Sequence, residues 1–204
     1  MKVITPYAIL SYPTLVTPKA NEQGKLKYSA TLVFLKGTDL TELKKAAVEA
    51  GIGKFTNAIK TPGGVLTFVD AVKNKVLKWP FRDDAIAKGY PEGAIFFSTN
   101  SEQRPGLALN FNDPTTGKVA ICPEDKIMDY FYPGSVVRAV LNAYGYDNKS
   151  RGVTFGLQHL QFVRHGDRLD NRTAAQDEFS ALEETPGGID AALAAPTPDI
   201  NSLI

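Results

Sequence analysis

Cysteine is nearly absent from this chain of 204 residues, which contains Cys122 and no other. A single cysteine excludes an intrachain disulfide and indicates a reducing compartment. The sequence also lacks an apolar run of membrane-spanning length, and no apolar signal-peptide core follows Met1. We therefore expect a soluble protein of the cytoplasm, long enough for one well-packed core.

Signatures of catalysis and metal binding are missing as well. The chain has two histidines, His159 and His165, which with Cys122 do not by themselves make a standard structural zinc site. Neither a Walker A motif nor a G-x-S-x-G motif occurs. We predict no enzyme activity, no cofactor and no metal site. A metal-dependent nuclease using the acids Asp83, Asp84 and Asp113 is the alternative from another class.

Basic residues are absent from the C-terminal stretch 173–204. Of the 22 acids in the chain six lie in this stretch, which leaves 16 acids against all 23 Lys and Arg in residues 1–172. The body thus carries +7 and the tail −6. The six acids are Asp177, Glu178, Glu183, Glu184, Asp190 and Asp199. This asymmetry predicts a polyanion-binding body followed by an acidic, largely disordered tail, although a merely solvated acidic end has the same composition.

Strand-type runs dominate the body, because branched and aromatic residues recur in short segments between turn residues. We predict strands over residues 7–12, 27–35, 94–101, 107–111, 135–147 and 151–163, with a weaker one at 65–69. These runs favour a mainly β fold with minor α content, namely an OB-fold-like antiparallel β-barrel with one inserted helix and long loops. A β-sandwich is the structural alternative.

Helical signals are few. Leucines and alanines at helical spacing predict a helix over 40–50, with Asp39 and Glu42 at capping-box spacing and Gly51 as its stop. A second, short helix is predicted over 123–131, where a proline precedes acids in the first turn. A marginal helix is predicted over 173–182.

Aromatic side chains interleave with basic ones in the predicted strand 135–147. Alternation places Arg138, Asn142, Tyr144 and Tyr146 on one face, opposite small apolar residues. A groove that binds single-stranded nucleic acid combines cations, which contact the phosphates, with aromatic rings, which stack on the bases. The predicted DNA-binding residues are Lys27, Lys75, Lys78, Trp79, Arg82, Arg138, Tyr144, Tyr146, Lys149 and Arg151.

Other readings stay open at this point. A core position is the alternative for Trp79, as it is for most of the phenylalanines. Single-stranded RNA offers the same phosphates and base faces as DNA, so an RNA-binding or annealing module fits the same residues. A structural protein of a virion is compatible with the composition but leaves the aromatic and basic pattern unused.

Several longer strings make the chain resemble the phage single-stranded DNA-binding proteins of a family long catalogued as a domain of unknown function. They include YAILSYPTL, KYSATLVFL, YPEGAIFFSTNSEQRPG, FYPGSVVRAVLNAYGYDN and RGVTFGLQHLQFVRHGDRLDNR, within residues 7–179. The resemblance implies an oligonucleotide-binding fold that coats single-stranded DNA without sequence preference in phage replication or recombination, and an acidic C-terminal tail. We expect this tail to modulate DNA binding or to dock replication or recombination proteins. Two departures are Asp84, where a glycine is expected, and the final SLI, which lacks the aromatic tip of related tails.

Overall fold

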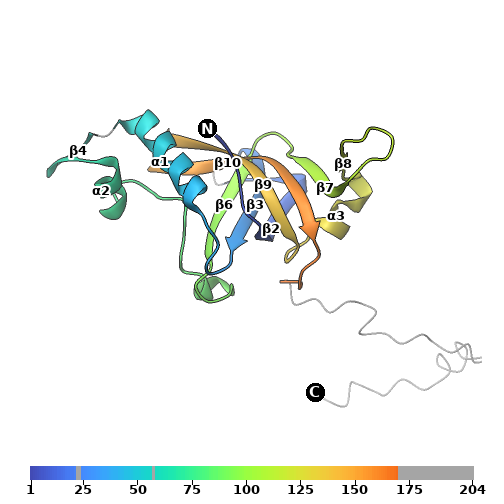
Figure 1. Ribbon diagram of the computed structural model, residues 1–204. Helices are drawn as coiled ribbons and strands as arrows, with labels where there is room; N and C mark the ends of the chain where they lie inside the picture. The colour runs from blue at the N-terminus through green and yellow to red at the C-terminus, as the bar shows by residue number, and fades with distance from the viewer. Residues whose placement is uncertain (22–23, 57, 170–204) are drawn as a thin grey trace, which may run out of the picture. The chain divides into compact units, whose positions relative to one another are not determined.

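The computed structural model describes residues 1–21, 24–56 and 58–169, and this part of the chain is mostly β (Figure 1). Its strands are β1 (Lys2–Ile4), β2 (Ala8–Ala20), β3 (Leu26–Phe34), β4 (Ile59–Thr61), β5 (Gly64–Leu66), β6 (Ile95–Ser101), β7 (Gly106–Asn112), β8 (Val119–Ile121), β9 (Val136–Asp147) and β10 (Arg151–Arg164). Its α-helices are α1 (Thr41–Phe55), α2 (Phe68–Lys73) and α3 (Ile127–Tyr130), and 3-10 turns cover Ile86–Lys88 and Glu124–Lys126. The mainly β prediction is confirmed.

Some predictions concern residues outside these ranges. The boundary at 172, the acidic tail 173–204 and the helix over 173–182 all lie beyond the last described residue. Within the described ranges, no helix has both the length and the apolar character needed to cross a membrane.

Five strands form a ring. Along the sheet β9, β2, β3, β6 and β10 are successive neighbours, and β10 pairs back with β9. β1 extends the sheet beyond β9, while β7 and β8 extend it beyond β10. Two pairings, of β10 with β6 and with β7, are parallel, which departs from the antiparallel expectation. Hairpin partners must run antiparallel, but β10 meets β6 and β7 through longer connections that leave the direction free.

Aromatic rings fill the interior of this ring of strands. Phe97 lies 5.5 Å from Phe34 and 4.7 Å from Phe155, between ring centroids, and all three side chains are fully buried. Phe81 closes the cluster with edge-on contacts to Phe97 and Phe155 at 5.4 and 5.8 Å. Burial of each such side chain contributes about 1.5–3 kcal/mol, so these rings are a main source of the stability of the fold.

Helix α1 begins as predicted but ends later. Gly51, the predicted stop, lies inside the helix, where the Phe68 ring occupies the space that a side chain would need. Gly51 thus allows the Phe68 ring to pack closely against helix α1, and it does not end the helix. At the other end, Asp39 accepts a hydrogen bond from the Thr41 N–H at 2.9 Å, so the predicted capping box with Glu42 is not formed.

The predicted strand over 65–69 is correct only for its first residues. β5 pairs with β4 in a small separate hairpin, and helix α2 begins immediately afterwards. The switch occurs at Thr67, whose hydroxyl accepts from the Asp70 N–H at 3.1 Å and so caps the helix. Phe68 then turns into the core against α1.

A small second cluster covers part of the outer face of β3 and β6. It consists of Val33, Ala85, Tyr90, Ala94 and Phe96, most of them from the segment between Arg82 and β6. This cover explains why Val33 is buried although its neighbours Leu32 and Phe34 face the interior. The rest of that outer face, toward the start of β3, lies outside this cluster, and Lys27 and Ser29 there are partly exposed.

Candidate nucleic-acid interface

The two faces of β9 are sorted as the alternation predicted. Val137, Ala139, Leu141 and Ala143 are buried in the core. The intervening residues point outward, and these are Arg138, Val140, Asn142, Tyr144 and Tyr146. Period-two geometry is local, so the sequence alone was enough for this assignment.

Tyr144 lies at the centre of this outer face. Its ring extends over Gly156 of β10, since a Cβ at Gly156 would come within 3.4 Å of the Tyr144 ring. Gly156 in turn pairs with Asn100 of β6, so the ring spans the junction of three strands. Burial, reinforced by the charge of Glu102 and by Tyr146, raises the pKa of the phenol. The result is a neutral ring, fixed on one side by the sheet and 38% exposed on the other.

Lys27 approaches the same place from β3. Its ammonium donates to Asn100 Oδ1 at 3.4 Å, and its side chain is only 26% exposed. Next along β3 and β6, the hydroxyls of Thr31 and Ser98 share a hydrogen bond of 2.9 Å. The outer face of β3 and β6 beside Lys27 and Asn100 thus carries short polar side chains.

Arg138 is held at the other end of the outer face. Its Nε donates to Gln161 Oε1 at 2.7 Å, and Gln161 Nε2 donates to the Leu109 carbonyl at 3.0 Å. This chain of bonds crosses from β9 over β10 to β7 and orients an exposed guanidinium. A guanidinium oriented in this way is well suited to a phosphate.

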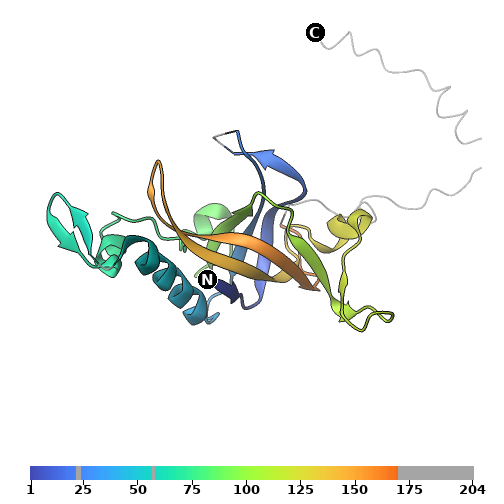
Figure 2. The same ribbon diagram turned by 90° about the horizontal axis from the view of Figure 1, so that it is seen from above.

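The tip of the β9–β10 hairpin gathers three further cations. Lys149 is exposed in the turn, and Arg151 lies beside Asp147 at 3.3 Å and over the Phe55 ring at 5.2 Å. Lys78, far away in sequence, joins them because its backbone N–H donates to the Arg151 carbonyl at 2.9 Å. The β2–β3 and β9–β10 hairpins project on the same side of the ring of strands (Figure 2).

Three of the predicted residues have other surroundings. Trp79 is half-buried and packs 6.4 Å from Phe68 and 5.4 Å from Phe81, so we assign it to the core. Arg82 makes a two-bond contact with Asp84, at 3.0 and 2.6 Å, above the Phe96 ring. Lys75 is exposed in the turn after α2, with a positive φ of 57°. Their roles as DNA contacts stay predictions.

Tyr12 is an exposed aromatic residue that sequence reasoning missed. It follows Ser11 at an irregular point of β2, with a φ of 44° and 72% exposure. The only signal in the sequence was a tyrosine before a proline, which does not say that the ring is exposed.

Tyr90 is a buried neighbour of Tyr12. Burial raises the pKa of Tyr90, and the nearby Tyr12 phenol adds to the shift. The Tyr90 hydroxyl donates to Ser11 Oγ at 3.0 Å.

Acids and nucleophiles are dispersed over the described part of the chain. No group of three His, Cys, Asp or Glu side chains there is arranged to hold a metal. Asp84 is engaged by Arg82, and Asp113 accepts from the backbone N–H groups of Thr115 and Thr116. Burial raises the pKa of the Cys122 thiol, which disfavours the nucleophilic thiolate.

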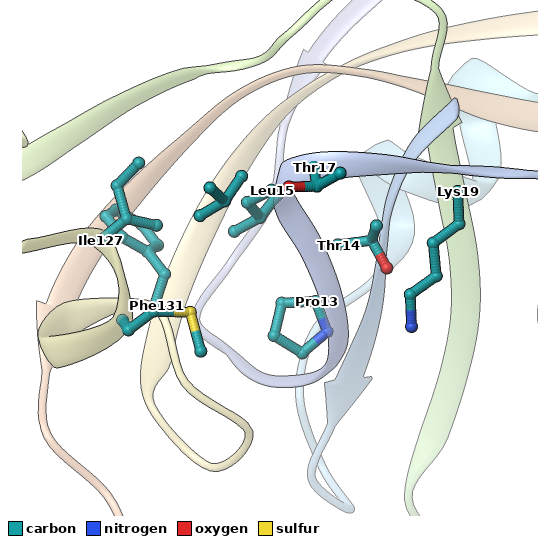
Figure 3. Close-up of a pocket in the computed structure, with 9 residues that line it drawn as sticks. Pro13, Thr14, Leu15, Thr17, Lys19, Ile127 and Phe131 are labelled. Atoms are coloured by element: carbon teal, nitrogen blue, oxygen red, sulfur yellow. The ribbon is translucent and has the colours of Figure 1, made fainter. Parts of the chain in front are cut away.

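A pocket of 210 Å³ lies between β2 and the segment that contains α3 (Figure 3). Its lining is mainly apolar, and Lys19 is the only charged residue in it. The lining residues are Pro13, Thr14, Leu15, Val16, Thr17, Lys19, Ile127, Met128 and Phe131. No acid, histidine or cysteine is among them.

A ring of five strands whose outer face presents tyrosines between cations is typical of the oligonucleotide-binding class of folds. Comparison with known families agrees. The family described as "Enterobacter phage Enc34, ssDNA-binding protein" matches residues 1–189, and the chain belongs to this family.

Individual relatives are more distant. "Putative protein p50" of Acyrthosiphon pisum secondary endosymbiont phage 1 is 29% identical over 196 residues, which cover 90% of this chain and 97% of that protein. The single-stranded DNA-binding protein from bacteriophage Enc34 has a similar fold, with a TM-score of 0.58 and 21% identity over 88% of this chain and 90% of that one. Its complex with ssDNA matches with a TM-score of 0.60 and 21% identity, over 82% and 89% of the two chains.

Proposed function

We propose that this protein binds single-stranded DNA without sequence preference and coats it during phage DNA replication or recombination, in the cytoplasm of a bacterial host. The observation that carries the proposal is the Tyr144 ring, which lies over Gly156 on the outer face that also carries Lys27 and its partner Asn100. Membership of a family of ssDNA-binding proteins supports it. The protein acts by binding alone, with no metal or cofactor.

The physical basis is stacking combined with phosphate neutralisation. A ring that is already immobilised loses little further freedom when a base stacks on it. Every base has a flat face, so stacking tolerates any sequence, while the cations follow the sugar-phosphate backbone. The cations assigned to this track are Lys27, Lys78, Arg138, Lys149 and Arg151.

Titration of a labelled oligo-dT at two or more salt concentrations tests the proposal. On single strands the logarithm of the affinity falls with that of the salt concentration by about 0.7 per neutralised phosphate, so five contacts predict a slope of about −3.5. No binding at low salt would overturn the proposal. An RNA oligomer of equal length serves as competitor, and preferential displacement by RNA would favour an RNA-binding role. Incubation with magnesium or manganese is expected to leave the strand intact.

The acidic stretch 173–204 is expected to compete with the strand for the basic face. It carries six acids and no base, opposite a body of +7. Removal of residues 173–204 should therefore tighten oligo-dT binding, most clearly at low salt, where screening is weakest. The measurement compares the full chain with the 1–172 truncation in the same buffer. Equal or weaker binding by the truncated chain would leave the stretch only a role in docking replication or recombination proteins.

A further inference from the structure

Glu102 directly follows β6 and lies between cations of the β2–β3 hairpin. Its carboxylate is 3.9 Å from the Lys25 ammonium and 4.0 Å from the Lys27 ammonium. The glutamate side chain is 63% exposed, so water surrounds most of it. Contacts of this length on a solvated carboxylate are loose, and a stronger anion can replace it.

The charge of the same carboxylate also acts on Tyr144. Its negative charge is, after burial, the second cause of the raised pKa of Tyr144. Glu102 thus contacts Lys25 and Lys27, and it directly follows the strand whose Asn100 pairs with Gly156, the residue beneath the Tyr144 ring. A phosphate that meets Lys27 would take the place of this carboxylate, which lies 4.0 Å from the Lys27 ammonium.

We propose that Glu102 is a built-in competitor of the nucleic-acid phosphate, which occupies Lys25 and Lys27 in the free protein and is displaced when a strand binds. This inference rests on the proposed function and adds a residue that sets the affinity of the site. In the free protein the three groups sum to +1 rather than +2. The protein thus gives up part of its attraction for the strand, which favours release and rebinding over permanent coating.

Glu102 is not needed to position Lys27. The Lys27 ammonium also donates to Asn100 Oδ1 at 3.4 Å, and this contact does not involve the carboxylate. Asn100 belongs to β6 and pairs with Ser29 of β3, so the sheet itself holds it. Removal of the Glu102 charge should therefore free the cation without displacing it.

The test is Glu102→Gln in the full chain, with Glu92→Gln as matched control. Glu92 is exposed and precedes the opposite end of β6, so both variants change the net charge equally. Glu102→Gln should bind oligo-dT about three- to fivefold more tightly at low salt. Its salt slope should steepen by about 0.7, the contribution of one further neutralised phosphate. Glu92→Gln should shift affinity by less than about twofold, because solvent and salt screen a distant charge.

A double-mutant cycle with Lys27→Met measures the coupling between the two residues in oligo-dT affinity. A purely structural role of Glu102 would not produce this coupling. If Glu102 suppresses Lys27, the substitution should weaken binding about two- to threefold more in the Glu102→Gln background than in the wild type. Equal losses in both backgrounds, or an affinity of Glu102→Gln no higher than that of Glu92→Gln, would overturn the inference. If the wild-type chain itself does not bind oligo-dT, the proposed function fails instead.

Discussion

Tyr144→Ala is expected to weaken oligo-dT binding about tenfold to a hundredfold, the largest loss from any single outer-face residue. Stacking of a base on an aromatic side chain contributes about 1–3 kcal/mol, and each 1.4 kcal/mol corresponds to a factor of ten. Tyr144 is favoured over other aromatic residues because its ring is both partly exposed and fixed over Gly156. Tyr146, which is half-buried, should show a smaller loss.

Tyr144→Phe is the matched control at the same position. It keeps the ring and removes only the hydroxyl, so its affinity should stay within about twofold of the wild type if stacking is the interaction. Thermal unfolding of each variant checks that the sheet is intact. An unchanged affinity of a folded Tyr144→Ala variant would remove this residue from the interface, and an equal loss in both variants would assign the effect to the hydroxyl.

Gly51→Ala is expected to destabilise the fold by about 1–3 kcal/mol, the usual range for overpacking a core. An added methyl group would overlap the Phe68 ring, which is itself buried. To relieve the overlap the Phe68 ring has to move, and with it the start of α2. Since Phe68 packs edge-on against Trp79 at 6.4 Å, the displacement should also reach the indole.

Gly53→Ala provides a control of opposite sign in the same helix. An added Cβ at Gly53 meets no atom within 4 Å, so alanine there only improves helix propensity. We expect a gain of about 0.5–1 kcal/mol. Urea unfolding followed by fluorescence measures both effects, because Trp79 is the single tryptophan of the chain. Similar stabilities of the two variants would contradict the close contact between Gly51 and Phe68.

Gly51→Ala is also expected to affect one part of the DNA-binding face and not another. The segment that follows α2 brings Lys78 to Arg151, where the two backbones are joined by hydrogen bonds. Gly51→Ala should therefore also loosen the cation cluster at the β9–β10 tip, while leaving Tyr144 in place.

Much of the interface followed from local pattern. The two faces of β9 are set by the alternation of side chains along a strand, which depends on nothing outside the segment. The cations at the hairpin turn and the charge difference between residues 1–172 and 173–204 are likewise properties of the chain itself. The same holds for the strands that form the ring and for the start of helix α1.

The remainder depended on contacts between residues distant in sequence. Trp79 and Tyr144 are both aromatic residues near cations, and only the packing of α2 and the ring of strands shows that one joins the core and the other the surface. The pairing of β3 with β6, of β6 with β10 and of β10 with β9 brings Lys27, Glu102 and Tyr144 to the same outer face from three separate stretches. Composition and periodicity thus determined which strands the protein forms and which aromatic and charged residues they carry. The tertiary structure decided which of these residues lie close together, because strand pairing is set by the total burial of many side chains and not by any one segment.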